Sequence, residues 1–200
     1  INIGRLGFLA TVQKDHIEEA IDHLISNNYE IDERSLLSVK TDRPNELGDL
    51  NFALNEITLS RKNTTSMVTI ETNLDKEYLT SYWADGLIIA TPTGSTGYSL
   101  SCGGPILPPN TQSLVLTPIA PHNLNARPLV VPDSTHIDLS TEAREDEVLL
   151  SLDSRTTSID SSSKIAIKKA DFSIKTVQLK GHTFFKTLRE KLLWGEDKRN

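Results

Sequence analysis

The chain has 200 residues, of which 37% are hydrophobic, and this is enough for a hydrophobic core. Its net charge of −6 argues against a nucleic-acid-binding protein, because such proteins normally present a basic surface to the phosphate backbone. The single cysteine, Cys102, excludes an internal disulfide, and no apolar run approaches the roughly 20 residues that cross a bilayer. We expect a folded cytoplasmic protein without nucleic-acid or membrane partners.

The first segment of the chain begins at Ile1 with no methionine and no signal-peptide charge pattern, so we expect it to enter the protein in mid-domain. A helix is predicted over residues 15–26, with Asp15 as its N-cap and Glu18 as the capping-box partner. Its apolar residues recur at helical spacing: Ile17, Ala20, Ile21, Leu24 and Ile25. Residues 29–40 then alternate in the manner of a strand.

Short β-rich runs separated by turn residues follow from about residue 37. They cover residues 53–60, 67–72, 77–83, 87–91, 113–119, 128–131, 136–139, 148–152, 163–168 and 172–179. One helical turn is predicted at 96–101, and a closing helix at 183–194. The pattern predicts an α+β protein built around an all-β, sandwich-like domain.

The segment from Asp85 to Pro105 is the most informative part of the sequence. An apolar strand runs into Pro92, which has no N–H to continue a β ladder, so a loop must follow. Glycines in this loop permit close backbone approach, and its hydroxyl groups suit a ligand that carries phosphate or ribose. A hydrophilic turn that only closes a hairpin is the alternative.

The order of four motifs resembles that of NAD kinases, which transfer a phosphate from ATP to the 2′-hydroxyl of NAD. The motifs are Gly4-Arg5-Leu6-Gly7-Phe8-Leu9, Asn55-Glu56, the segment 85–104 and the segment 118–131. The resemblance implies that residues 37–180 form an all-β NAD-binding domain. It also implies that residues 1–36 and 181–200 complete an α/β nucleotide-binding domain that is mostly missing from this chain.

The resemblance also implies the residues that bind substrate. In this interpretation Asn55 and Glu56 contact the adenosine portion of NAD, Asp85 and the Ala120 carbonyl contact its nicotinamide end, and Asp85 comes from a neighbouring subunit. The remaining implied substrate-binding residues are Phe8, Thr93, Gly94, Thr96, Gly97, Tyr98, Ser101 and Arg155. Structural alternatives remain open: an edge strand for the Asn-Glu pair, a simple Asp-Gly turn for Asp85, and core packing for Tyr98.

Two positions depart from the family pattern. Gly97 stands where the family often has alanine, which we expect to loosen the turn, and Arg155 stands where glutamine is usual. A cation at position 155 could bridge phosphate oxygens, and an arginine on a solvent-facing turn is the equal alternative. His122 and Cys102 are interpreted as structural residues, and the histidine spacing offers no zinc site.

The catalytic carboxylate of NAD kinases lies in a Gly-Gly-Asp-Gly motif, and no Gly-Gly-Asp occurs in this sequence. We therefore expect the catalytic Asp to lie upstream of Ile1 and the chain alone to be inactive. The expected ligands are NAD, NADP and ATP with Mg²⁺ or another divalent cation, and the expected assembly is a homo-oligomer, a dimer or tetramer. The alternatives are a lipid kinase of the diacylglycerol or sphingosine kinase type and a non-enzymatic β-sandwich binding module.

Overall fold

The computed structural model describes residues 8–10, 12–43, 46–48, 51–63, 66–181 and 183–192. The chain divides into two compact units, one made of residues 1–33 and 175–200 and the other of residues 34–174. Strands β1 (Tyr29–Thr41) and β12 (Ile165–Leu179) contribute residues to both units. None of the described helices is long and apolar enough to cross a membrane.

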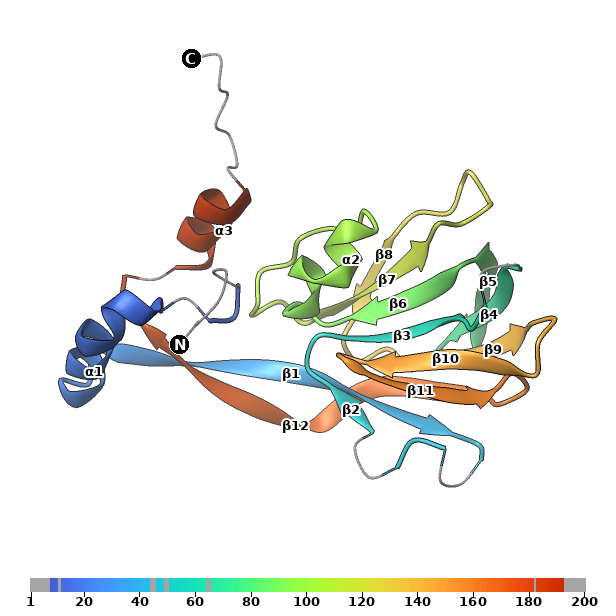
Figure 1. Cartoon of the computed structure of the whole chain (residues 1–200), viewed down its shortest axis with the longest axis horizontal. Coiled ribbons are helices and arrows are strands. Elements are labelled where there is room, and N and C mark those ends of the chain that lie inside the picture. The colour runs from blue at the N-terminus through green and yellow to red at the C-terminus, as the bar shows by residue number, and fades with distance from the viewer. Residues whose placement is uncertain are drawn as a thin grey trace, which may run out of the picture. The chain divides into compact units, whose positions relative to one another are not determined.

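The larger unit is a sandwich of two six-stranded sheets (Figure 1). One sheet has the order β2-β1-β12-β9-β4-β5 and the other β11-β10-β3-β6-β7-β8. The remaining strands are β2 (Phe52–Ala53), β3 (Glu56–Arg61), β4 (Val68–Leu74), β5 (Glu77–Ala84), β6 (Gly86–Ala90), β7 (Ser113–Ile119), β8 (Leu129–Pro132), β9 (Ile137–Glu142), β10 (Glu147–Leu152) and β11 (Arg155–Asp160). The sandwich confirms the predicted β-rich fold.

The core lies between the two sheets and takes alternate residues of most strands, as the two-residue period of a strand requires. In β4, for example, Ile70 and Thr72 are buried, whereas Glu71 between them is exposed. Strand β6 is buried at all five positions because both of its faces are covered. Residues 87 and 89 belong to the core between the sheets, and residues 88 and 90 join a second, smaller cluster with Val115. This second cluster lies beneath the loop that follows β6.

The chain changes sheets at two short connections, and both carry predicted site residues. Strand β2 pairs with β1 in the first sheet, whereas β3 pairs with β10 and β6 in the second. Residues 54 and 55 make this crossing. Strand β5 similarly belongs to the first sheet and β6 to the second, with Asp85 between them.

The smaller unit holds the helices α1 (Ile17–Ile25) and α3 (Phe184–Leu192). A short 3₁₀ helix, η1 (Lys14–His16), precedes α1, so the predicted cap is wrong: Asp15 lies in the 3₁₀ turn and His16 is the N-cap, without a side-chain cap bond. The Thr176 hydroxyl donates a hydrogen bond to the Asp32 carbonyl at 3.1 Å. The assignment of the two chain ends to an α/β domain stays a prediction.

Seven of the ten predicted β runs, from 67–72 to 148–152, each overlap one of the strands β4 to β10, and the run 53–60 overlaps β3 and the end of β2. Two differences remain. Residues 163–168 and 172–179 are not two strands but parts of β12, which continues through Asp171. Asp171 is exposed, so its carboxylate stays in solvent and does not interrupt the strand. Strand β11 was not predicted, because Ile159 is its only apolar residue. As the outermost strand of its sheet, β11 buries little surface and needs no apolar alternation.

Candidate dinucleotide-binding site

The predicted Asn55-Glu56 pair lies where the chain enters the second sheet. Asn55 is in the bend before β3, and Glu56 is the first residue of that strand, opposite Ala90 of β6. The expectation that both residues interrupt a continuous strand over 53–60 is therefore wrong. The edge-strand alternative is also wrong, because β3 lies between β10 and β6.

A carboxylate from the turn between β10 and β11 holds this bend. Asp153 Oδ1 accepts the N–H groups of Asn55 at 2.7 Å and Glu56 at 3.3 Å, and Oδ2 accepts that of Leu54 at 2.9 Å. The Asp153 N–H in turn donates to the Glu56 carbonyl at 3.0 Å. No local pattern in the sequence indicates that the Asp153 side chain would organise residues 54–56.

The loop after β6 holds the same bend from its other side. The Thr91 N–H donates to the Asn55 carbonyl at 2.9 Å, and the Thr91 hydroxyl donates to the Leu54 carbonyl at 2.6 Å. Together with Asp153, Thr91 satisfies every backbone N–H and carbonyl of residues 54–56. No backbone group of this segment therefore needs a side-chain partner from Asn55 or Glu56.

Glu56 is the unusual ionisable group of this region. Its Oε2 is buried and has no hydrogen-bond partner among the described residues. Burial, followed by the negative charge of Asp153, raises the pKa of Glu56 from 4.5 to about 7. A carboxyl group with this pKa exchanges its proton near neutral pH, and a buried oxygen without a hydrogen-bond partner is costly unless a ligand or a water supplies that partner.

Two glycines bring the loop against the Asn55-Glu56 pair. Gly94 lies so close to the Asn55 backbone that no side chain fits there. A Cβ on Gly97 would lie 3.1 Å from Glu56 Oε2 and 3.1 Å from the Gly94 carbonyl oxygen. Gly97 therefore leaves room beside the Glu56 carboxyl group. An alanine at this position, as the family often has, would crowd that carboxyl group.

Buried hydroxyl groups fix the loop, in addition to the apolar contacts of Cys102 and Leu107 with the second cluster. The short helix η2 (Gly94–Thr96) is followed by α2 (Tyr98–Ser101), in agreement with the predicted helical turn. Ser95 is buried, donates to the Pro92 carbonyl at 2.7 Å and accepts from the Leu107 N–H at 3.0 Å. These bonds use the hydroxyl of Ser95 internally, so part of the hydroxyl-rich sequence serves the loop and not a ligand.

The predicted threonine ligands lie at the surface of this loop. The Thr96 hydroxyl donates to the Thr93 carbonyl at 3.2 Å, which leaves its oxygen able to accept a further hydrogen bond. Both threonines are half-buried, and Ser101 at the end of α2 is exposed. The structure thus brings together five of the predicted residues beside Asp153: Asn55, Glu56, Gly94, Thr96 and Gly97.

Tyr98 and Asp85 form a second part of the site. Tyr98 is 47% exposed, so the core-packing alternative is wrong. Burial, its interaction with Cys102 and the nearby charge of Asp85 raise the pKa of Tyr98. Asp85 Oδ2 accepts from the Arg61 guanidinium at 3.0 Å, so this carboxylate is already paired within its own chain. Burial raises the pKa of the Cys102 thiol, which fits a packing residue and not a nucleophile.

The connection after β7 carries Ala120, whose carbonyl is the implied backbone contact of the nicotinamide end. Ala120 has a positive φ of 43°, an uncommon conformation for a residue other than glycine, and it is exposed. The ring of His122 lies 4.2 Å from that of Trp83, and the backbone N–H of His122 donates to the Trp83 carbonyl at 2.9 Å. These contacts agree with the structural interpretation of His122.

The alternative interpretation of Arg155, an arginine on a solvent-facing turn, is wrong. The Arg155 guanidinium lies 5.3 Å from the centre of the Phe52 ring and donates to the Phe52 carbonyl. Phe52 also makes an edge contact with Phe172, at 5.4 Å between ring centres. In this structure, therefore, Arg155 packs on the start of the 52–56 segment.

Phe8 belongs to the smaller unit. Its ring lies 6.2 Å from that of Phe184, and the Lys191 ammonium lies 5.4 Å from its centre. Both contacts are made within that unit. Residues 4–7 of its motif lie outside the described residues.

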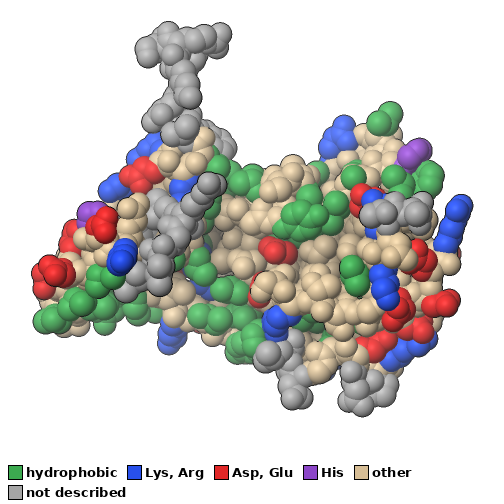
Figure 2. Space-filling model, viewed as in Figure 1, with side chains coloured by type: hydrophobic (Ala, Val, Ile, Leu, Met, Phe, Trp, Pro, Cys, Tyr) green, Lys and Arg blue, Asp and Glu red, His purple; other side chains and the backbone are tan. Residues whose placement is uncertain are grey.

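The surface around the loop carries little positive charge. Figure 2 shows mainly uncharged groups over α2 and the neighbouring strands, whereas Lys, Arg, Asp and Glu gather at the right-hand end of the sandwich. Within the described ranges, no three His, Cys, Asp or Glu side chains are grouped to hold a metal ion. An anionic ligand at this surface would be recognised mainly by neutral polar groups and backbone N–H donors.

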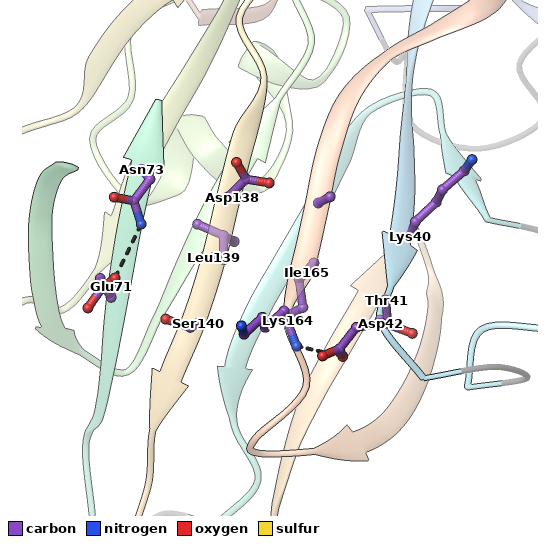
Figure 3. A pocket seen from close by; sticks show the side chains of 11 residues that line it. Lys40, Thr41, Asp42, Glu71, Asn73, Asp138, Leu139, Ser140, Lys164 and Ile165 are labelled. Atoms are coloured by element: carbon purple, nitrogen blue, oxygen red, sulfur yellow. Dashed lines mark hydrogen bonds between the residues drawn. The ribbon is translucent and has the colours of Figure 1, made fainter. Parts of the chain in front are cut away.

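A groove of about 450 Å³ lies elsewhere, on the solvent face of the first sheet (Figure 3). Two hydrogen bonds join residues of its lining: Asn73 donates to Glu71 at 3.2 Å, and the Lys164 N–H donates to Asp42 at 2.9 Å. None of the predicted site residues lines it. Size alone therefore does not make this groove the candidate site.

Comparison with known proteins gives a consistent result. Residues 54–179 match the family model of the ATP-NAD kinase C-terminal domain. The chain is 63% identical to the NAD kinase of Flavobacterium johnsoniae and 52% identical to that of Cytophaga hutchinsonii, over all of this chain and 68% of each relative.

Solved structures agree with these sequence matches. The yeast NADH kinase complexed with NADH superimposes with a TM-score of 0.87 at 30% identity, over 98% of this chain and 58% of the yeast chain. The NAD kinase from Archaeoglobus fulgidus in complex with ATP gives a TM-score of 0.80 at 28% identity, over 96% of this chain and 72% of that one. The chain thus spans less than two thirds of the yeast enzyme.

Proposed function

Because the chain belongs to the NAD kinase family, we propose that the Asn55-Glu56 bend and the loop after β6 bind the NAD that the enzyme phosphorylates. The reaction transfers the γ-phosphate of ATP to the 2′-hydroxyl of the adenosine ribose and gives NADP. The carrying observation is that the unpartnered buried oxygen of Glu56 faces Gly97 beside Asn55. A carboxyl and an amide suit a ribose hydroxyl and an adenine edge.

The loop supplies the second half of the proposed contacts. Tyr98 offers an exposed ring and hydroxyl to the base, and Thr93, Thr96 and Ser101 offer further polar groups at the surface. The Ala120 carbonyl and Asp85 remain proposed contacts of the nicotinamide end. The pairing of Asp85 with Arg61 supports a role in which this carboxylate accepts one further hydrogen bond while its charge is balanced.

The phosphoryl-transfer step needs charge neutralisation by a divalent ion and a group that takes the hydroxyl proton. The described residues hold no cluster suited to a resident metal, so we propose that the cation, Mg²⁺ or a related ion, arrives with ATP as substrate. No residue of this chain is proposed as the proton acceptor. A cytoplasmic location and assembly as a dimer or tetramer complete the proposal.

The test uses the full-length protein with ATP, NAD and Mg²⁺ or Mn²⁺, and measures NADP with an NADP-specific dehydrogenase. Absence of NADP would refute the enzymatic proposal, and a phosphorylated lipid product would favour the lipid-kinase alternative. Asn55→Ala and Tyr98→Ala should each weaken NAD binding. Tyr78→Ala is the matched control, because Tyr78 is 59% exposed on β5, outside the proposed site.

A thermal-shift measurement separates the enzyme from a non-enzymatic binding module. A ligand at 100 times its dissociation constant raises the free energy of unfolding by about 2.7 kcal/mol. We expect NAD and NADP to raise the melting temperature of the wild type and to raise it less in the Asn55→Ala variant. No shift with any nucleotide would support the binding-module alternative.

A further inference from the structure

We propose that Asp153 is a positioning residue of the dinucleotide site: its carboxylate fixes the 54–56 bend so that Asn55 and Glu56 face the ligand. This inference rests on the proposed function, because it assumes that the pair binds NAD. Asp153 is not proposed to touch NAD. Its effect is transmitted through the backbone of the bend and through its charge.

The first argument is the number of hydrogen bonds that one side chain makes to the bend. Asp153 accepts three successive backbone N–H groups, at distances between 2.7 and 3.3 Å, from residues more than 95 positions earlier in the chain. Residues 54 and 55 connect the two sheets and so lack the ladder partners that a strand would give them, and Glu56 is only the first residue of β3. A buried N–H without a partner is costly, so the carboxylate replaces what the sheet cannot supply.

The second argument is the conformation of Asp153 itself. Its φ is +53°, in the left-handed region that residues other than glycine seldom adopt. Asparagine and aspartate tolerate this region better than most residues, since their short side chains bond nearby backbone groups. Here the Asp153 N–H also bonds the Glu56 carbonyl, so the turn and the bend hold each other in both directions.

The third argument is steric transmission to the loop. Thr91 bonds the carbonyls of residues 54 and 55, and Gly94 packs directly on the Asn55 backbone. A displacement of the bend would therefore move the loop or break its bonds. Asp153 is thus coupled to both halves of the proposed site, although it belongs to neither.

The fourth argument is electrostatic and supports the geometry. The charge of Asp153 is the second cause, after burial, that raises the pKa of Glu56. The elements facing Glu56 otherwise present Ala90 on β6 and the glycines 94 and 97 of the loop. The nearby Arg155 guanidinium is engaged with Phe52. Removing the charge of Asp153 should therefore lower the pH at which Glu56 titrates.

The decisive variant is Asp153→Asn in the full-length protein. An asparagine side chain keeps one acceptor oxygen but turns an NH₂ group toward N–H donors. We expect the KM for NAD to rise by about tenfold or more, with kcat changed less than about twofold and the KM for ATP unchanged. The inflection in the pH dependence of kcat/KM for NAD should move to lower pH, which a purely structural residue would not cause.

Asp171→Asn is the matched control, because the Asp171 side chain is 88% exposed and pairs only with Lys168 among the contacts described. It should leave both the KM for NAD and the pH profile at wild-type values. A double variant with Glu56→Gln tests the coupling. The effect of Asp153→Asn on the KM for NAD should be smaller in the Glu56→Gln background, because one of the two groups that it positions has already been altered.

The outcomes separate this inference from the proposed function. Wild-type protein that forms no NADP refutes the proposed function. If the wild type is active but Asp153→Asn leaves the KM for NAD or the pH profile unchanged, the role of Asp153 is overturned and the proposed function stands. If Asp153→Asn does not fold, Asp153→Glu replaces it: this variant keeps the charge, so a raised KM with the wild-type pH profile supports positioning, and an unchanged KM overturns it.

Discussion

A Cβ atom on Gly94 would lie 2.0 Å from the carbonyl oxygen of Asn55 and 2.4 Å from the carbonyl carbon. No ordinary contact is so short, and both atoms belong to a backbone that other hydrogen bonds hold in place. The loop and the bend therefore approach each other at a distance that only glycine allows. The glycine at position 94 is thus explained by contact with Asn55 and not by a positive φ.

Gly94→Ala should consequently damage both stability and NAD binding. Forcing a methyl group into this contact must displace the loop or the bend, at a cost of about 1 to 3 kcal/mol in the free energy of unfolding. The expected result is a lower melting temperature together with a KM for NAD raised by about tenfold or more. Chemical denaturation and steady-state kinetics measure the two effects.

Gly103→Ala is the control for this prediction. Its φ is +83°, so alanine is strained there, but no heavy atom lies within 4 Å of the added Cβ. We expect a loss of stability of about 1 to 3 kcal/mol without a change in the KM for NAD. An equal rise of that KM in both variants would mean that general destabilisation, and not the contact with Asn55, affects binding.

Glu56→Gln should change how stability depends on pH. Since burial and Asp153 raise the pKa of folded Glu56 from 4.5 to about 7, the folded protein retains a proton in this window that the unfolded chain has lost. The free energy of unfolding of the wild type therefore falls as pH rises from about 4.5 to 7 and stays reduced above it. Glutamine carries no charge, so the variant should lose this decline and gain stability relative to wild type at pH 8.

Urea denaturation at pH 5 and pH 8 provides the measurement. Glu71→Gln is the comparison, because Glu71 is exposed on β4 and bonds Asn73 at the surface. This control should retain the wild-type difference between the two pH values. If Glu56→Gln retains it as well, another group must cause the decline.

The sequence was sufficient to identify the sandwich and the loop, and the reasons are local. Apolar alternation marks β4, a continuous apolar run marks β7, and Pro92 with its following glycines marks the end of β6. The sequence was not sufficient to predict strand β11 or the role of Asp153. An edge strand needs little apolar surface, and the bonds of Asp153 reach residues about 98 positions away, which no local pattern encodes.

Arg155→Gln should act on stability and not on substrate affinity. The guanidinium packs on the Phe52 ring and bonds its carbonyl, and glutamine can replace only part of that contact. We expect a loss of about 1 kcal/mol, equivalent to a fall of about 2 to 4 °C in melting temperature. The KM values for ATP and NAD should stay within about twofold, and a larger rise for either would instead indicate the phosphate contact considered from the sequence.

Thr72 and Thr117 allow a matched test of buried hydroxyl groups. Both side chains are fully buried, but the Thr72 hydroxyl has no hydrogen-bond partner among the described residues, whereas that of Thr117 lies 2.8 Å from the Ser99 hydroxyl. Because an unsatisfied buried hydroxyl costs about 1 to 3 kcal/mol, Thr72→Val should raise the free energy of unfolding by about 1 kcal/mol. Thr117→Val should lower it by a similar amount, since Ser99 loses its partner.

Differential scanning calorimetry distinguishes the two variants by the sign of the change in melting temperature. Ser99 lies in α2, so Thr117→Val should also loosen the loop and raise the KM for NAD, whereas Thr72→Val should leave it unchanged. Thr72 lies on β4, in the other sheet. Destabilisation by both substitutions would show that the Thr72 hydroxyl is satisfied in solution and would contradict the prediction, because valine has nearly the same shape and differs chiefly in lacking the hydroxyl.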